Sequence, residues 1–218
     1  MFETLLSKTF LLLTLSLFTA YLGSLVSYKK AQAALQEGHP ETIHGGMFGA
    51  IIINIIAFIL LMFLSGKTPL NMILMFVFTL SSGYTLGIYA FSYGDVAQKA
   101  IALTAGTTLL TGLLANFGNI DFTGLGKILG IALIIFVVIS IVRIFIKIKG
   151  GASRFMAGAG TLLFTGYLLY DFSRLAKVKA VVAMNNWETA LNFAISIYLD
   201  IINLLMQLMQ LLSSGSHN

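Results

Sequence analysis

The sequence predicts an all-α integral membrane protein, built as a bundle of seven transmembrane helices. First, 58% of its 218 residues are hydrophobic and only 10% are charged, and the mean hydropathy is +0.93. Soluble domains carry about 25% charged residues, so this composition lies outside their range. Second, the few charged residues leave long apolar runs between them. Third, these runs are too long for β-strands and lack the alternation that strands show.

The rest of the composition narrows the function classes. The chain has no cysteine, which excludes disulfides, thiol catalysis and cysteine metal sites. Its net charge of +5 comes from cations that stand singly or in small groups between apolar runs. That distribution is typical of loop and interface anchors rather than of a nucleic-acid surface. The length suits a single transmembrane domain over residues 1–212, and we expect the tail at 213–218 to be disordered.

A helix needs about 20 apolar residues to cross the hydrocarbon core of a bilayer. Seven runs approach or exceed this length, near 9–28, 46–66, 69–93, 99–118, 127–148, 153–174 and 184–212. The first run is about 20 residues long and no A-x-A cleavage site follows it. A first membrane helix is therefore favoured over a cleaved signal peptide.

Polar or turn-rich stretches separate these runs. The only long one, "KKAQAALQEGHPETIHG" at 29–45, holds Pro40 and two of the three histidines and predicts a loop. The link "KTP" at 67–69 is so short that the second and third helices must be antiparallel neighbours. The other breaks are "GNIDFTGLGK" at 118–127, with the Asx-turn formers Asn119 and Asp121, "KIKGGAS" at 147–153 and "AKVKAVVAMNNW" at 176–187.

The last predicted helix carries a stripe of polar side chains. Its members recur every three or four residues and fall within an arc of roughly 80°: Asn185, Thr189, Asn192, Ser196, Asp200, Asn203, Gln207 and Gln210. Unsatisfied polar groups in hydrocarbon cost several kcal/mol each, so this face is expected to line a hydrophilic path inside the bundle. The alternative is that the stripe joins helices through hydrogen bonds, typically worth about 0.6 kcal/mol each.

Asp200 stands in the middle of this stripe and needs a partner, because a carboxylate inside a membrane is costly. The only other acid within or at the edge of an apolar span is Asp171, in "GYLLYDFSRL". A short link makes the sixth and seventh helices antiparallel neighbours, so the two acids are predicted to face each other. Two carboxylates at close range share a proton and titrate as a coupled pair, as a proton sensor requires. The alternative for Asp171 is an ion pair with Arg174 at i+3.

Several stretches resemble the Bax-inhibitor family of membrane proteins. "YLLYDFSRL" at 167–175, a short basic link and "ALNFAISIYLDIINLLMQLMQLL" at 190–212 are similar to its C-terminal signature. "FTLSSGYTLG" at 78–87 and "DFTGLGKIL" at 121–129 agree as well. The resemblance therefore extends over most of the chain after the second predicted helix.

This resemblance implies a seven-helix bundle with the last helix central, and a pH-sensitive calcium leak. The sensor would be a pair of aspartates at the positions of Asp171 and Asp200, which would also bind calcium weakly and transiently as it passes. Calcium would be the permeant ion, and no cofactor is implied. The thirteen cations divide six against seven between the two sides, which leaves the orientation open. The resemblance implies a cytoplasmic N-terminus.

In some bacterial relatives, an arginine at the inner end of the second helix latches onto the aspartate of the sixth helix and holds the pore shut. Ser65 occupies the matching position here, so Lys67 and Arg174 are the candidate latch cations. Relatives also carry an acid within the second helix, where this chain has Asn54. Both departures bear on gating and on the strength of calcium binding.

Three functions compete. The leading one is a calcium leak in a bacterial cytoplasmic membrane, formed by a monomer in the lipid bilayer. The second is an interaction protein that binds another membrane protein, such as a membrane-bound protease or a cell-death regulator. The third is an intramembrane aspartyl protease, which also uses two aspartates. "YD" at 170–171 fits a protease motif, but Asp200 lies in "YLDI" with no glycine nearby, so we expect no enzyme. His39 and His44 flank Pro40 and are expected to be solvated loop residues rather than metal ligands.

Overall fold

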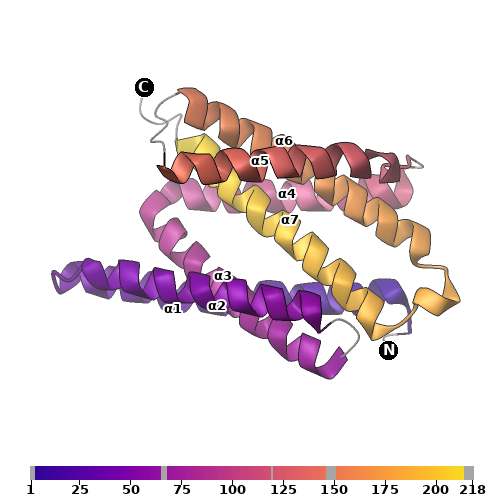
Figure 1. Ribbon diagram of the computed structural model, residues 1–218, viewed down its shortest axis with the longest axis horizontal. Helices are drawn as coiled ribbons and strands as arrows, with labels where there is room; N and C mark the ends of the chain where they lie inside the picture. The colour runs from indigo at the N-terminus through magenta and orange to yellow at the C-terminus, as the bar shows by residue number, and fades with distance from the viewer. Residues whose placement is uncertain (1–2, 65–67, 119, 146–150, 214–218) are drawn as a thin grey trace. The chain divides into compact units, whose positions relative to one another are not determined.

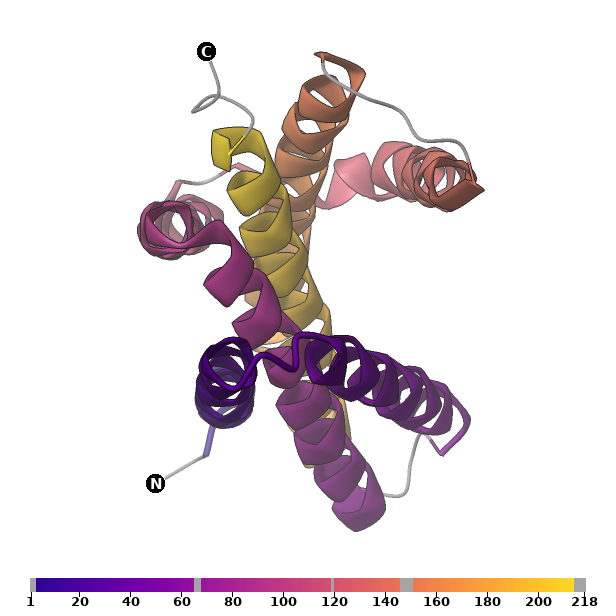
Figure 2. The same ribbon diagram turned by 90° about the vertical axis from the view of Figure 1, so that its left-hand side faces the viewer.

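The computed structural model describes residues 3–64, 68–118, 120–145 and 151–213, and all regular structure in these ranges is helical. Figure 1 shows long helices joined by short connections, and Figure 2 shows the same helices after a quarter turn. The long helices are α1 (Leu5–Gln36), α2 (Glu41–Phe63), α3 (Thr68–Tyr93), α4 (Asp95–Phe117), α5 (Gly126–Phe145), α6 (Gly151–Val178) and α7 (Trp187–Ser213). Two short 3-10 helices, η1 (Thr123–Leu125) and η2 (Val182–Met184), precede α5 and α7.

Within the described ranges, six helical segments are long and apolar enough to cross a membrane. They are α1, α2, α3 from Pro69, α4, residues 123–143 with most of α5, and α7. The prediction of an all-α membrane protein is confirmed. The α6 helix is not among the six, since its glycines and its charged residues, Arg154, Asp171, Arg174 and Lys177, lower its hydropathy. The count of seven spans therefore stays a prediction.

The predicted loop at 29–45 is wrong over most of its length. The α1 helix continues to Gln36 and α2 begins at Glu41. The stretch "KKAQAALQ" consists of good helix formers, which extend α1 beyond its apolar run. Gly38 ends α1 with a φ of 76°, and the N–H of His39 donates to the carbonyl of Ala34 at 2.8 Å, the arrangement of a Schellman cap. Pro40 then precedes α2, where a proline costs no helical hydrogen bond.

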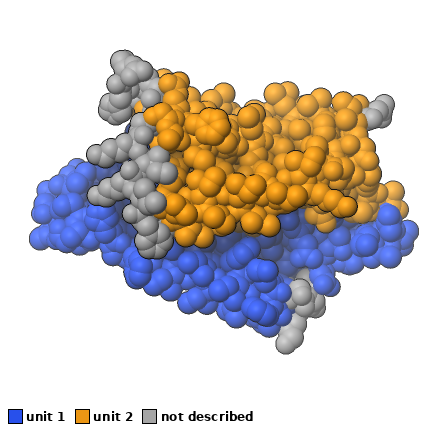
Figure 3. All heavy atoms as spheres, turned by 45° about the horizontal axis from the view of Figure 1, so that its top comes forward, with its two compact units in different colours: residues 1–94, 181–198 blue, residues 95–180, 199–218 orange. Residues whose placement is uncertain are grey.

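The chain divides into two compact units, shown in Figure 3. Unit 1 comprises residues 1–94 and 181–198, and unit 2 comprises residues 95–180 and 199–218. Thus α1, α2 and α3 belong to unit 1, and α4, α5 and α6 belong to unit 2. The α7 helix contributes its first part to unit 1 and its remainder, from Leu199, to unit 2. Both Asp171 and Asp200 lie in unit 2.

In unit 1, α1 and α3 pack backbone against backbone through small residues. A Cβ added at Gly83 of α3 would lie 2.5 Å from the Cα of Ala20 on α1. A Cβ added at Gly23 of α1 would lie 2.9 Å from the backbone nitrogen of Tyr84 on α3. Small residues are what permits such an approach between membrane helices. The core of unit 1 is therefore built on glycine as well as on large apolar side chains.

In unit 2, glycines of α6 make room for side chains of the neighbouring helices. A Cβ at Gly166 would lie 2.9 Å from Cδ2 of Leu129 on α5. A Cβ at Gly160 would lie 2.7 Å from Oε1 of Gln207 on α7. The bare glycines of α6 thus bring the second part of α7 close to its backbone, and this contact positions the candidate site.

Candidate functional site

The two aspartates predicted to pair lie together in unit 2. Asp171 on α6 is 4% exposed and Asp200 on α7 is 6% exposed. Their carboxyl groups are within hydrogen-bonding reach of each other. A hydrogen bond between two carboxyl groups needs a proton on one of them. The geometry can therefore hold one proton between two acids.

Asp171 also forms the local ion pair that the sequence offered as the alternative. Nη1 of Arg174 donates to Oδ1 of Asp171 at 3.2 Å, one turn along the same helix. The guanidinium carbon of Arg174 lies 5.4 Å from the ring centroid of Tyr170. The Arg174 side chain is 46% exposed, whereas that of Asp171 is 5% exposed. Asp171 is thus placed between a partly exposed cation and a buried second acid.

Asp200 has no such cation among the described residues. Its Oδ2 atom is buried and no hydrogen-bond donor of the described chain reaches it. Buried polar atoms are nearly always partnered, and a carboxylate oxygen accepts only from a donor or a cation. Tyr167, one turn before Asp171 on α6, is close enough to both acids for electrostatic interaction. A proton or a metal ion bound at this oxygen would supply the partner that it lacks.

The polar stripe of α7 is only partly assembled within one unit. Asn203, Gln207 and Gln210 belong to unit 2 with Asp200, whereas Thr189, Asn192 and Ser196 belong to unit 1. Gln207 is 9% exposed and lies against Gly160, as described above. Asn203 donates to the carbonyl of Leu199 at 2.8 Å, within its own helix. Thr189 and Ser196 are half-buried and Asn192 is exposed.

Asn185 does not belong to this stripe, and its assignment to the last helix is wrong. It follows η2 and precedes α7, because Asn186 caps that helix by accepting from the N–H of Thr189 at 2.8 Å. Nζ of Lys8 donates to Oδ1 of Asn185 at 3.0 Å, and Nδ2 of Asn185 donates to the carbonyl of Glu3 at 2.6 Å. Asn185 therefore ties the start of α1 to the start of α7 within unit 1. Helical periodicity alone could not reveal the cap.

A second polar cluster, in unit 1, was not predicted as a site. Tyr198 is fully buried, and its hydroxyl shares a hydrogen bond with the hydroxyl of Ser82 on α3. Nδ2 of Asn54 on α2 donates to the carbonyl of Phe78 at 3.0 Å and to Oγ of Ser81 at 3.2 Å. Phe78, Ser81 and Ser82 all lie in "FTLSSGYTLG", which the sequence marked only as a motif. Asn54 thus joins α2 to α3 where an acid was expected in relatives.

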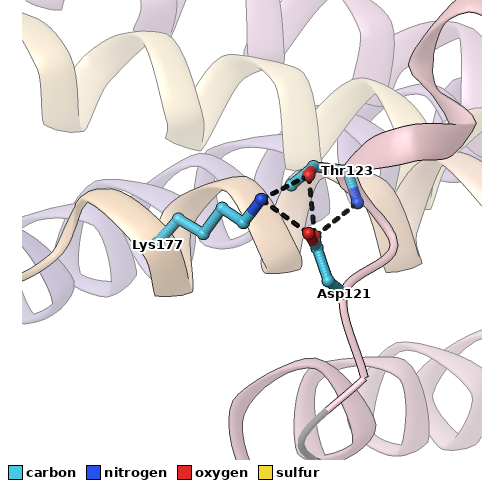
Figure 4. A network of polar contacts seen from close by, with 3 residues as sticks. All are labelled: Asp121, Thr123 and Lys177. Carbon is cyan, nitrogen blue, oxygen red and sulfur yellow. Dashed lines mark hydrogen bonds and ion pairs between the residues drawn. The ribbon is translucent and has the colours of Figure 1, made fainter.

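Another network holds the connection between α4 and α5 against the end of α6 (Figure 4). Nζ of Lys177 lies 2.6 Å from Oδ2 of Asp121 and donates to Oγ1 of Thr123 at 2.7 Å. The N–H of Thr123 donates to Oδ1 of Asp121 at 2.9 Å, which is the predicted Asx turn. The hydrogen bonds from Lys177 and then from Thr123 lower the pKa of Asp121 from 3.8 to about 2. Asp121 is therefore an anion throughout the physiological range.

The remaining predicted residues give no assembled latch or metal cage. Ser65 and Lys67 lie outside the described residues, so of the two candidate latch cations only Arg174 is placed. Among the described residues, no group of three or more His, Asp or Glu side chains is arranged to hold a metal ion. His39 pairs instead with Glu41, at 3.0 Å between Nδ1 and Oε1.

Comparison with known proteins assigns the family. The family model described as "Inhibitor of apoptosis-promoting Bax1" matches residues 3–217. The chain belongs to the Bax-inhibitor family. This match covers the aspartate pair, the "FTLSSGYTLG" stretch and the Asp121 network, and it confirms the resemblance drawn from the sequence.

Plant and bacterial proteins are similar to this chain. LIFEGUARD 1 of Arabidopsis thaliana is 32% identical over 153 residues, which cover 68% of this chain and 62% of the plant protein. An uncharacterized protein of Helicobacter pylori strain J99 is 30% identical over 205 residues, covering 90% of this chain and 80% of the relative. An uncharacterized protein of Campylobacter jejuni is 33% identical over 156 residues, covering 68% and 63%. The chain thus spans less than two thirds of LIFEGUARD 1.

Proposed function

We propose that this member of the Bax-inhibitor family is a passive calcium leak, gated by protonation of the Asp171–Asp200 pair. The observation that carries the proposal is the juxtaposition of two buried carboxyl groups, with an oxygen of Asp200 that no donor of the described chain satisfies. Two buried acids without a full set of partners are costly to keep for stability alone. A role in binding protons and cations accounts for that cost.

Gating follows from the charge of the pair. At low pH one proton is shared between Asp171 and Asp200, their repulsion is relieved, and the compact state is favoured. At high pH both carboxylates are ionised, so they repel each other and attract a cation. Arg174 pairs with Asp171 and is partly exposed, so it acts as the latch cation that offsets one of the two charges. Flux should therefore rise with pH.

Calcium binding in this path is weak and transient. Calcium takes six to eight oxygen ligands, and the pair offers the carboxylate oxygens of two residues only. The remaining ligands would be water, supported by amide and hydroxyl groups of α7 such as Asn203 and Gln207. A leak benefits from weak coordination, because an ion that binds tightly does not leave.

The proposal includes a membrane arrangement. We infer seven spans with α6 among them, α7 at the centre, a cytoplasmic N-terminus in a bacterial cytoplasmic membrane, and a monomeric protein without cofactor or catalytic activity. Because the chain has no cysteine, a single introduced cysteine is the only thiol in each variant, and its side of the membrane can be tested. Cysteines placed at Ser153 and at Ala180, at the two ends of α6, should be labelled by an impermeant reagent from opposite sides of sealed vesicles. Labelling from one side would exclude α6 as a span.

Calcium flux into liposomes containing the purified protein tests the mechanism, measured from about pH 5 to about pH 8. The wild type should show flux that rises with pH, and Asp171→Asn and Asp200→Asn should flatten that dependence. Asp95→Asn, which removes an exposed acid at the start of α4, is the matched control and should keep the wild-type profile. An unchanged pH profile in both variants of the pair would refute gating by these residues.

A second candidate function is binding to another membrane protein. The description of the family as inhibitors of a pro-apoptotic protein favours it. In that case the polar side chains of α7 serve packing, as the bond from Asn203 to its own helix illustrates. A stable co-purifying membrane protein, together with folded liposome-embedded protein that shows no cation flux at any pH, would select this function over the leak.

A further inference from the structure

Unit 2 contains a cavity that lies apart from the aspartate pair. It measures about 210 Å³ and is lined by Ala115, Asn116, Ile120, Asp121, Ser173, Ala176 and Lys177. Ser173 is two residues from Asp171, which on a helix turns it by about 200° to the opposite side of α6. The cavity is therefore a separate site on the face of α6 that meets α4.

One polar group in this cavity has no partner. Ser173 is 3% exposed, and its Oγ makes no hydrogen bond with the described residues. A buried hydroxyl that is left unpaired costs free energy, and such groups are rare in folded proteins. Because Ser173 lines the cavity, a ligand there could accept its hydrogen bond.

The charges at the cavity favour an anion. Two ammonium groups stand at its edge: that of Lys177, and that of Lys179, which donates to Oδ1 of the lining residue Asn116 at 3.2 Å. Lys177 uses two of its three N–H donors on Asp121 and Thr123. The described residues place no carboxylate within ion-pair distance of Lys179. Asp121 is committed to Lys177 and Thr123, so the cavity keeps one positive charge in excess.

The position of the cavity indicates where the anion comes from. It lies between the end of one candidate span, at Phe117, and the start of the next, at Thr123. That boundary between span and connection is the depth of lipid headgroups. Ile120 lines the cavity and is 53% exposed, and Phe117, three residues before it, is 77% exposed. Exposed apolar side chains beside a basic polar cavity suit a molecule with a phosphate at one end and an acyl chain at the other.

We propose that this cavity binds the phosphate of an anionic phospholipid headgroup through Lys177, Lys179 and the hydroxyl of Ser173. Basic groups next to membrane helices bind anionic lipids, and the loss of one lysine is expected to weaken the affinity by about fivefold. The cavity has several times the roughly 30 Å³ that one water molecule occupies, so a phosphate group has room in it. The inference concerns lipid binding and does not depend on the proposed leak.

The test uses the full chain, purified in a neutral detergent without calcium. Phosphatidylglycerol is titrated in, and the shift of the unfolding temperature gives the affinity, since a ligand of the folded state stabilises it. Phosphatidylcholine, glycerol phosphate and inorganic phosphate are titrated in parallel. Lys179→Gln and Ser173→Ala should each weaken phosphatidylglycerol binding, Lys179→Gln by about fivefold, and Lys179→Arg should restore it.

Lys127→Gln is the matched control, because Lys127 is an exposed lysine near the same connection that does not line the cavity and, unlike Lys179, donates no hydrogen bond to a lining residue in the described structure. It should bind phosphatidylglycerol like the wild type. Equal losses in Lys127→Gln and Lys179→Gln would mean a diffuse surface charge and would overturn the site. Equal stabilisation by phosphatidylcholine would overturn recognition of the anion. Saturable binding of inorganic phosphate that displaces phosphatidylglycerol would overturn the lipid as occupant and identify a soluble phosphate instead.

Discussion

The close approach of α1 to α3 gives a sharp stability prediction for Gly83→Ala. The added Cβ would lie 2.5 Å from the Cα and 2.6 Å from the carbonyl carbon of Ala20. Non-bonded carbon atoms prefer about 3.5–4.0 Å, so the helices must separate by about 1 Å. The obstructing atoms are backbone atoms, which cannot rotate away as a side chain would.

Two opposing terms set the size of the destabilisation expected for Gly83→Ala. Overpacking a well-filled contact typically costs about 1–3 kcal/mol. Replacing glycine by alanine inside a helix returns about 0.5–1 kcal/mol, because alanine loses less conformational entropy on folding. The net destabilisation expected for Gly83→Ala is therefore about 1–2 kcal/mol. Separation of the two helices should also lengthen the hydrogen bond between Thr19 and Thr79, which joins the same helix pair.

Gly49→Ala is the matched control, since Gly49 is a helical glycine of unit 1 with nothing within 4 Å of the added Cβ. Denaturant unfolding of the two variants in the same neutral detergent, followed by circular dichroism, measures both changes. We expect Gly49→Ala to be neutral or slightly more stable than the wild type and Gly83→Ala to be clearly less stable. If the two variants unfolded alike, the backbone contact between α1 and α3 would not exist as described.

Three other predictions follow from single contacts. Lys177→Gln should raise the pKa of Asp121 from about 2 toward 3.8, as read by carboxyl NMR. Because folding lowers this pKa, the stabilisation is present above pH 3.8 and is lost as the pH falls toward 2. The variant should show a weaker loss of stability in acid, since only the hydrogen bonds from Thr123 then hold the pKa down. Tyr198→Phe should cost about 1–2 kcal/mol in the free energy of unfolding. The double variant with Ser82→Ala should lose less stability than the sum of the two single variants, because the hydrogen bond between the two hydroxyls can be lost only once. Asn185→Ala should lower the free energy of unfolding by about 0.5–1.5 kcal/mol, because it removes the bonds to Lys8 and Glu3. It should leave the pH profile of calcium flux as in the wild type, since Asn185 lies before α7. A flattened profile would mean that Asn185 belongs to the ion path after all.

The sequence was sufficient where the determining signal is local. Apolar runs between charges located the long helices, and the short link between α6 and α7 put Asp171 opposite Asp200. The pairing of these acids was inferable because each is expensive alone in an apolar helix and only the other was available. Likewise, the i+3 spacing of Asp171 and Arg174 is a helical neighbour relation, and the structure contains that ion pair.

Prediction failed where the contact depends on residues far apart or on a helix end. Ser82 and Tyr198 are separated by 116 positions, and Lys8 and Asn185 by 177, so no periodicity links them. The end of α1 was misplaced because polar residues were equated with a loop, although lysine, glutamine and alanine favour a helix in water as well. The cavity at Ser173 depends on a side chain left unpaired in three dimensions, which a one-dimensional pattern cannot express.

The hydropathy of α6 falls below that of the six candidate spans, and the packing of this helix explains why. Its mean hydropathy is lowered by glycines at the contacts with α5 and α7, namely Gly160 and Gly166, and by Asp171 in the candidate site. Those residues are costly against lipid but favourable against another helix, where a glycine permits close approach and an acid can meet a partner. A helix that faces protein on most of its sides does not need the apolar surface by which spans are recognised. Low hydropathy in α6 is therefore what its packing requires, and accessibility of its two ends, rather than composition, is the measurement that decides whether it crosses the membrane.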